Sequence, residues 1–219
     1  MGWAGRPETL RPWEKCFFLD SFYRTYQELT RFPNVRYAYQ MGTSPDQAEV
    51  ASRFASVAQR FCGVVDSAPN LERTELLVQV YRILPQLISE AVTLPPMELD
   101  DTQTPEDEKR ESLARANVGS RYPQWSQLYE LLKEKLGDWD LYWEVFDPRK
   151  DNQAIHGSLA DDIADIYRDL KEGLVLGETQ EASPGDNVWH WRLGFFSHWG
   201  KHAIDALRTI HFRLEGILG

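Results

Sequence analysis

Two histidines near the C-terminus have a spacing that could support metal chemistry. His198 and His202 lie four residues apart, and in a helix this spacing places both imidazoles on one face, one turn apart. Two nitrogens arranged in this way can bind one metal ion. No glutamate follows His198, so the sequence lacks the zincin motif His-Glu-x-x-His. The alternative interpretation is a pair of hydrogen-bonded histidines packed among aromatic side chains.

The helix expected over Ser158–Gly173 carries three aspartates that could complete such a site. Asp162, Asp165 and Asp169 border its apolar stripe, which consists of Leu159, Ile163, Ile166 and Leu170. Together with the two histidines they would offer mixed nitrogen and oxygen ligands, a set that suits one divalent ion such as zinc, manganese or iron. The alternative is that Asp162 merely complements the helix dipole in the first turn, while Asp165 and Asp169 belong to a solvated face paired with Arg168 or Lys171.

Other catalytic signatures are absent from the sequence. It has no glycine-rich phosphate loop and no Gly-x-Ser-x-Gly elbow. Its two cysteines, Cys16 and Cys62, have no metal-ligand spacing, and Cys62 is expected to pack as a small apolar side chain. A divalent metal ion is therefore the one cofactor for which the sequence offers candidate ligands.

The charge balance disfavours two classes of partner. Lysine and arginine number 24 and aspartate and glutamate 34, which gives a net charge of −10 at pH 7. Such a chain is repelled by the phosphates of nucleic acids and by anionic lipids. No stretch approaches the roughly 18 consecutive apolar residues of a membrane span, and the N-terminus lacks the pattern of a secretory signal. We therefore predict a cytoplasmic protein that binds neither nucleic acid nor membranes.

Apolar residues recur at helical spacing along most of the chain, which predicts an all-α bundle of about five or six helices. One helix is expected over Pro45–Asp66. A second would run from Asn70 to about Val92 with a kink at Pro85, because proline removes a backbone donor and crowds the preceding turn. A third is expected over Pro123–Leu136, ended by the glycine that follows it.

The remaining elements are expected in the C-terminal part of the chain. The aromatic segment Trp139–Pro148 is predicted to form a short helical turn. Ser158 and Gly173 are the expected cap and terminator of the helix that carries the aspartates. The last helix is expected from about Asn187 to Leu218 as one long central helix with an apolar seam. The only run that looks like a strand is Asn34–Tyr39.

The first forty residues differ in composition from the rest. They hold ten of the 27 aromatic residues and carry a net charge of +2. Met41 is followed at once by a Gly-Thr-Ser-Pro sequence that is typical of a helix start. We hypothesise that Met41 is the natural start and that residues 1–40 are an added extension or upstream sequence. Residues 41–219 would then form a single all-α domain.

Three segments of this C-terminal part resemble an uncharacterised bacterial family known as domain of unknown function 5063. They are Tyr142–Pro148, Leu159–Lys171 and the run from Trp191 through Ala203, which contains both candidate histidines. The resemblance covers about Asp46 to Phe212 and leaves the first forty residues outside. It implies a bacterial, cytoplasmic, helical protein without an assigned activity, so it transfers no catalytic residue.

Two classes of function are compatible with these features. The preferred prediction is a helical protein that acts through protein–protein interaction, because the aromatic segments could serve as core and partner surface and the acidic charge would accept a basic partner. The alternative is a metal-dependent hydrolase or metal-binding bundle that uses His198 and His202 with Asp162, Asp165 or Asp169. The substrate and the oligomeric state stay open.

Overall fold

The computed structural model describes residues 45–95, 125–145, 149–150, 152–178 and 186–218. All described residues belong to the unit Tyr39–Gly219. The predicted domain boundary after residue 40, the candidate start at Met41 and the strand-like run Asn34–Tyr39 lie outside the described residues and stay predictions.

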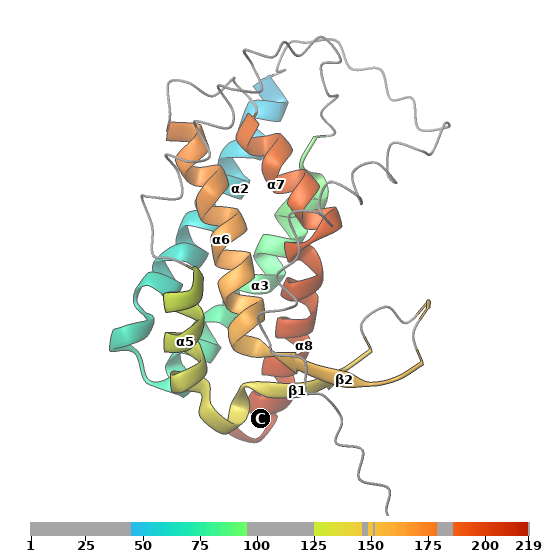
Figure 1. Cartoon of the computed structure of the whole chain (residues 1–219). Helices are drawn as coiled ribbons and strands as arrows, with labels where there is room; N and C mark the ends of the chain where they lie inside the picture. The colour runs from blue at the N-terminus through green and yellow to red at the C-terminus, as the bar shows by residue number, and fades with distance from the viewer. Residues whose placement is uncertain (1–44, 96–124, 146–148, 151, 179–185, 219) are drawn as a thin grey trace, which may run out of the picture. The chain divides into compact units, whose positions relative to one another are not determined.

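Within the described residues, six α-helices make up a bundle with one small sheet (Figure 1). The helices are α2 (Pro45–Asp66), α3 (Arg73–Thr93), α5 (Trp125–Leu136), α6 (Leu159–Glu178), α7 (Asp186–Ser197) and α8 (Trp199–Leu218). Two short 3-10 helices, η2 (Ala68–Asn70) and η3 (Gly137–Trp139), follow α2 and α5. The strands β1 (Leu141–Glu144) and β2 (Ile155–Ser158) form an antiparallel hairpin. The predicted all-α bundle is confirmed.

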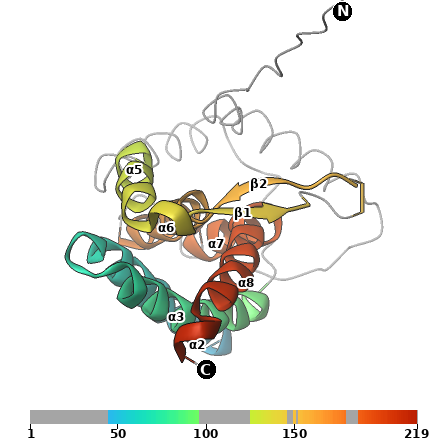
Figure 2. The same ribbon diagram turned by 90° about the horizontal axis from the view of Figure 1, so that it is seen from below.

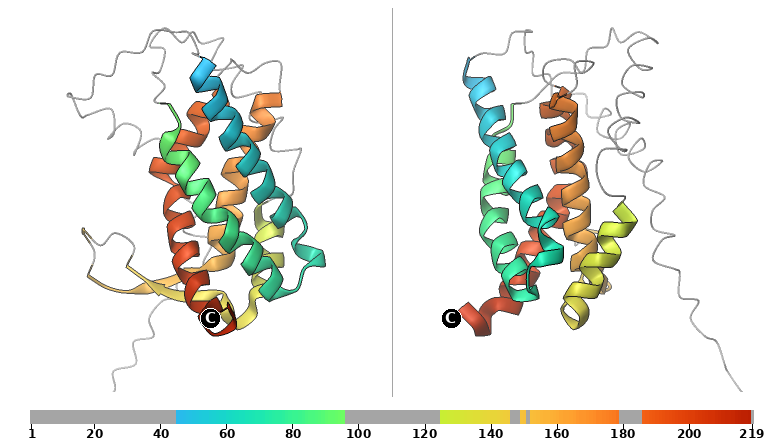
Figure 3. Two further views of the ribbon diagram at one scale, coloured as in Figure 1. Left: turned by 180° about the vertical axis from the view of Figure 1, so that it is seen from behind. Right: turned by 90° about the vertical axis from the view of Figure 1, so that its left-hand side faces the viewer.

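Helix α6 is the element around which the others pack. It contacts α2, α5, α7 and α8, and Figure 3 shows α2 and α3 on one side of it and α5 on the other. Seen from below in Figure 2, the hairpin lies on the side of α6 and α8 that faces away from α2 and α3. The predicted apolar stripe of α6 is fully buried, and it consists of Leu159, Ile163, Ile166 and Leu170.

Large aromatic side chains fill the space between α2 and the two C-terminal helices. The ring of Phe54 lies 4.9 Å from that of Trp191 and 6.1 Å from that of Trp199, measured between centroids. Both indole N–H groups donate to backbone carbonyls, Trp191 to Leu170 and Trp199 to Trp191, each at 3.1 Å. Because every polar atom of this cluster has a partner, the aromatic rings can be buried without an unsatisfied donor.

The boundaries of several helices agree with the sequence pattern. Helix α2 spans Pro45–Asp66 as predicted, and Gly137 ends α5 with a positive φ of 55°, a conformation that glycine adopts without strain. Helix α3 begins at Arg73 rather than Asn70, because residues 68–70 form η2. It continues through Pro85 to Thr93 as one helix, and the predicted kink stays a prediction.

Gly173 does not end α6, which continues to Glu178. An ideal Cβ at position 173 would lie 2.1 Å from Nε1 of Trp191. Glycine is therefore required at this point by the close approach of the indole ring, not by a helix terminus. The prediction of a terminator was wrong because glycine serves both purposes and the sequence alone does not distinguish them.

The predicted single helix over Asn187–Leu218 is two helices, α7 and α8, that meet at His198. The N–H of Lys201 donates to the carbonyl of His198 at 3.1 Å. This bond joins residues three apart, as in a 3-10 turn, instead of the four of an α-helix. Gly200 permits the bend, because a Cβ there would lie 2.1 Å from the carbonyl oxygen of Phe195. The apolar periodicity continues across the bend and so conceals it.

The aromatic segment Trp139–Pro148, predicted as a helical turn, contributes instead to η3 and to strand β1. In the hairpin the register pairs Leu141 with Ser158, Tyr142 with Gly157, Trp143 with His156, and Glu144 with Ile155. Successive side chains of β1 alternate between exposed and partly buried. Aromatic residues favour strands as well as helix surfaces, and four residues are too few for the alternation to be decisive in the sequence.

None of the helices within the described ranges combines the length and the apolar character that a membrane crossing requires. The predicted cytoplasmic location stays a prediction.

The two glycines at positions 173 and 63 provide a matched test of the packing of α7 on α6. We expect Gly173→Ala to lower the free energy of unfolding by roughly 1–3 kcal/mol, because the methyl group displaces Trp191. At Gly63, in α2, an added Cβ meets nothing within 4 Å, so Gly63→Ala should raise it by about 0.5–1 kcal/mol. Urea denaturation measures both, and equal effects would contradict this assignment.

Candidate metal centre

Three aspartates of α6 are buried on one side of the helix. Asp162, Asp165 and Asp169 are only 3%, 7% and 8% exposed, and their spacing of three and four residues aligns them along one face. The solvated face considered as the alternative for Asp165 and Asp169 is therefore wrong, although both carboxylates do pair with Arg168 of the same helix, at 2.9 and 3.3 Å. Carboxylates removed from water require charged or hydrogen-bonding partners.

The two predicted histidines supply partners for the outer pair of aspartates. Nδ1 of His198 lies 2.7 Å from Oδ2 of Asp169, and Nδ1 of His202 lies 2.8 Å from Oδ1 of Asp162. The two imidazole centroids are 5.0 Å apart. Each Nδ1 is thus bonded to a carboxylate, which fixes the orientation of the imidazole ring. The Nε2 atom of each ring then lies on the side of the other histidine.

Asp165 lies between the two imidazoles. Its Oδ2 is 3.7 Å from Nε2 of His198 and 3.5 Å from Nε2 of His202. Its other oxygen, Oδ1, forms an ion pair with Nη2 of Arg168 at 2.9 Å. Arg168 therefore leaves Oδ2 as the oxygen that faces both histidines. We call these five side chains the aspartate–histidine cluster. Its members are Asp162, Asp165 and Asp169 from α6, His198 from the α7–α8 bend and His202 from α8.

The three inner atoms of this cluster have dimensions close to those of a metal site. One possible ligand atom from each of His198, His202 and Asp165 lies within 4.8 Å of the other two, and Oδ2 of Asp165 is 3.7 and 3.5 Å from the two Nε2 atoms. A tetrahedral zinc with ligands at about 2.0–2.1 Å needs ligand atoms about 3.3 Å apart. Side-chain shifts of under about 1 Å would bring the three atoms to that separation, which is within the freedom of partly exposed side chains.

Tyr142 completes the hydrogen bonding of Asp162. Its hydroxyl donates to Oδ2 of Asp162 at 2.7 Å, so Asp162 is bonded on one oxygen by Tyr142 and on the other by His202. Gly157 opposite it in the hairpin makes room for the ring, since a Cβ there would lie 2.5 Å from Cζ of Tyr142. The sequence analysis missed Tyr142 because it assigned this segment to a helix.

Helix α6 begins at a cap that holds its first turn in place. Ser158 is the predicted cap, and its Oγ accepts the N–H of Asp161 at 3.2 Å. The buried carboxylate of Asp140 adds a second acceptor, taking the N–H of Ala160 at 2.8 Å and the hydroxyl of Ser158 at 2.9 Å. Both interactions satisfy donors that the helix itself leaves open. They fix the position of Asp162, one turn further along.

The cluster shifts the pKa values of its members in opposite directions. Burial alone would lower the pKa of His202, but the hydrogen bond and charge of Asp162 raise it to about 9. Burial raises the pKa of Asp162 to about 6 in spite of His202. Burial acts in the same sense on Asp169, yet His198 and Arg168 lower its pKa to about 2. Near neutral pH the charge of the ionised aspartates is thus balanced by cations. The proton on His202 supplies positive charge that a bound metal ion could supply instead.

The other histidines within the described residues lie away from the cluster's inner atoms. Nε2 of His190 contacts the backbone carbonyl of Asp169 at 3.1 Å. Nδ1 of His211 lies 2.9 Å from the hydroxyl of Tyr81. The ring of His156 packs against that of Trp143 in the hairpin, with centroids 3.9 Å apart and the planes tilted by 40°. The structure therefore brings together the five residues predicted as candidate ligands, and of the other histidines His190 touches the cluster, through the backbone of Asp169.

The fold and the cluster together define a small all-α bundle with buried carboxylates on a central helix and two histidines facing them. The sequence matches the family model Domain of unknown function (DUF5063) over residues 45–214. The chain belongs to this family, as the resemblance predicted.

Comparison of structures shows a related fold. The crystal structure of protein BF1032 from Bacteroides fragilis has 23% sequence identity to this chain and a TM-score of 0.57. The match covers 74% of this chain and 90% of that chain. A search of curated proteins finds no match. The predicted bacterial origin stays a prediction.

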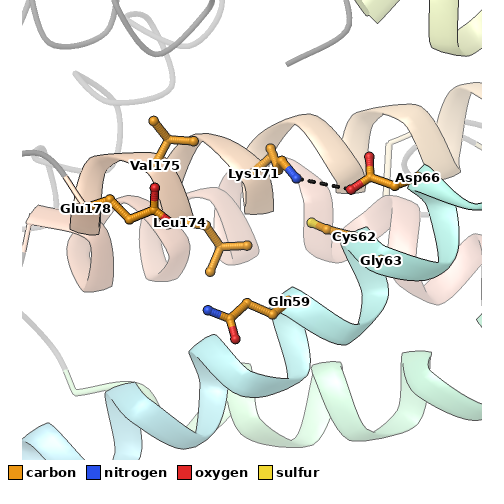
Figure 4. Close-up of a pocket in the computed structure, with 8 residues that line it drawn as sticks. All are labelled: Gln59, Cys62, Gly63, Asp66, Lys171, Leu174, Val175 and Glu178. Carbon is orange, nitrogen blue, oxygen red and sulfur yellow. Dashed lines mark hydrogen bonds and ion pairs between the residues drawn. The ribbon is translucent and has the colours of Figure 1, made fainter. Parts of the chain in front are cut away.

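A depression between α2 and α6 lies apart from the cluster (Figure 4). It has a volume of about 280 Å³ and is lined by Gln59, Cys62, Gly63, Asp66, Lys171, Leu174, Val175 and Glu178. An ion pair of 3.1 Å between Lys171 and Asp66 crosses it, and the hydroxyl of Tyr167 donates to the other oxygen of Asp66 at 2.6 Å. These contacts join α2 to α6, so the depression is part of the packing of the two helices.

Cys62 at the floor of this depression is buried, as predicted for a small apolar side chain. Burial raises the pKa of its thiol to about 12 from a usual value of 9.0. At pH 8 the thiolate fraction should accordingly be about a thousandfold lower than in an unfolded chain.

We expect Cys62 of the Cys16→Ser variant to resist iodoacetamide at pH 8 while the protein is folded, and to react completely in urea. Mass spectrometry of the intact protein reports the labelling. As pH rises from 9 toward 12, ionisation in the unfolded chain alone should reduce the free energy of unfolding. Labelling of the folded protein at the rate of the unfolded chain would contradict the burial of this thiol.

Proposed function

We propose that this protein binds one divalent transition-metal ion through Nε2 of His198, Nε2 of His202 and Oδ2 of Asp165. The single observation that carries the proposal is that these three residues each bring one possible ligand atom within 4.8 Å of the other two. Two imidazoles and one carboxylate are a ligand set that suits zinc, manganese or iron better than calcium.

The surroundings of the three atoms support the proposal. Metal-bound histidines in proteins usually donate their second nitrogen to a carboxylate or a carbonyl. Asp169 and Asp162 occupy that role here at 2.7 and 2.8 Å. Arg168 binds the remaining oxygen of Asp165, which leaves Asp165 with one oxygen for an ion. Buried hydrogen-bonded histidines without a metal remain the alternative that the experiment must separate.

Charge balance also supports a bound cation. The buried carboxylates of Asp162, Asp165 and Asp169 face one permanent cation, Arg168, and two imidazoles. With neutral imidazoles this group would carry an uncompensated negative charge of about two in a partly desolvated site, which is unfavourable. A divalent ion offsets that charge, and protonation of the imidazoles is the competing way to do so.

Three protein ligands leave coordination positions for water, and a bound metal of this kind would supply a water of lowered pKa for hydrolysis. Metal-assisted hydrolysis stays a prediction, and so does the action through a protein partner.

The first test measures binding of Zn²⁺, Mn²⁺ and Fe²⁺ to the full chain, purified without an affinity metal, by calorimetry and elemental analysis. We expect one equivalent of one of these ions in the wild type, and loss of that equivalent in His198→Ala and in His202→Ala. His211→Ala is the matched control, because His211 lies on α8 as His202 does and its Nδ1 contacts the hydroxyl of Tyr81 instead of the cluster.

The metal-free melting temperature of each variant separates loss of ligands from loss of fold. Folded variants that no longer bind the ion support the proposal. A wild type that binds none of the three ions in a defined stoichiometry overturns it, and so does undiminished binding in both histidine variants.

A second prediction concerns the carboxylates that orient the imidazoles. We expect Asp162→Asn and Asp169→Asn each to weaken metal binding by about 10–100-fold, because an amide no longer fixes the tautomer that presents Nε2. Asp138→Asn is the control, since Asp138 is exposed and pairs with Arg73 far from the cluster. Unchanged affinity in both cluster variants would show that the histidines are held by packing alone.

A further inference from the structure

A second depression lies where the hairpin meets α8. It has a volume of about 210 Å³ and is lined by Tyr142, Trp143, Arg208, Thr209, Phe212 and Arg213. We call it the Trp143 depression. None of its lining residues is a proposed metal ligand, so the inference drawn from it does not rest on the proposed function.

The walls of the Trp143 depression are aromatic and open to solvent. Trp143 and Phe212 are 62% and 60% exposed, although large aromatic side chains are usually buried more completely. They come from different elements, β1 and α8, and line the same hollow. Two exposed rings on either side of one hollow are suited to contact a third flat ring by stacking or edge-to-face packing.

The charge of this hollow is opposite to that of the whole molecule. Two of its six lining residues are arginines and none is acidic, although the chain carries a net charge of −10. An arginine guanidinium is planar and matches the two oxygens of a carboxylate. The hollow thus combines an attraction for one negative charge with two apolar surfaces.

The two arginines have different roles. Nη2 of Arg213 donates to the carbonyl of Leu141 at 2.9 Å, which holds β1 against α8. Arg208 makes no hydrogen bond or ion pair with any described residue, and its guanidinium lies 5.7 Å from the ring of Phe212. Arg208 is therefore the group with unused donors at this hollow.

From these observations we propose that the Trp143 depression binds a small aromatic carboxylate. The ring packs between Trp143 and Phe212, and the carboxylate accepts hydrogen bonds from Arg208. The volume lies below the range of roughly 300–1,000 Å³ that is typical of sites for larger ligands, which limits the ligand to a single ring with short substituents.

The experiment titrates the ¹⁵N-labelled full chain with benzoate, benzamide and benzylamine, which share a ring and differ in charge. The indole N–H signal of Trp143, identified by its absence in Trp143→Phe, is the reporter. The protein is first stripped of metal by dialysis against a chelator, so that a carboxylate cannot bind through an ion. We expect saturable shifts with millimolar benzoate and an affinity at least about tenfold lower for benzamide and benzylamine.

Two arginine variants form the matched pair for this test. Arg208→Gln should lower the affinity for benzoate by about tenfold or more, whereas Arg82→Gln, at an exposed site on α3, should leave it unchanged. Phe212→Ala should weaken benzoate and benzamide alike, because it removes the ring contact and not the charge. Equal affinity for the three compounds, benzoate binding that survives Arg208→Gln, or no shift of the Trp143 signal with benzoate would each overturn the proposal.

Discussion

The burial of three carboxylates on one face of α6 is the constraint on which the rest of this structure depends. An ionised carboxylate removed from water costs several kcal/mol unless it is paired. Arg168 of the same helix pairs with Asp165 and Asp169. The other partners of the three aspartates come from other elements, namely His198 at the α7–α8 bend, His202 on α8 and Tyr142 on β1. Only the native packing of α8 and the hairpin against α6 supplies all of these partners together, so the polar cluster specifies the arrangement of three elements that apolar packing alone would leave less defined.

The candidate site could be predicted in part from the sequence because helical spacing is a local property. His198 and His202 share a face as their separation of four residues indicates, and the three aspartates follow the edge of an apolar stripe. Tyr142 could not be found in this way. Its contact with Asp162, twenty residues away in the sequence, depends on the pairing of β1 with β2. No local pattern indicates which turn of α6 that hairpin will approach.

The errors in the predicted fold have a common physical origin. Gly173 was predicted to end one helix, whereas the helix containing Gly200 was predicted to continue without interruption. In the structure each is required by a close approach from elsewhere, the indole of Trp191 in one case and the carbonyl of Phe195 in the other. A glycine in a helix can indicate that there is no room for a side chain at that position. Only the tertiary structure shows which neighbouring atom takes up the space. Residue patterns therefore located the helices well and their interruptions poorly.

The bend between α7 and α8 has a consequence for the two imidazoles. In an unbroken helix the separation of residues 198 and 202 is set by the helical pitch and is nearly constant. Here His198 stands at the joint itself, while His202 lies within the rigid part of α8. The distance between the two Nε2 atoms then varies with the angle of the bend between α7 and α8. For the proposed metal site, this arrangement would let the spacing of the two imidazoles adjust to ions of different radius through a change at the joint.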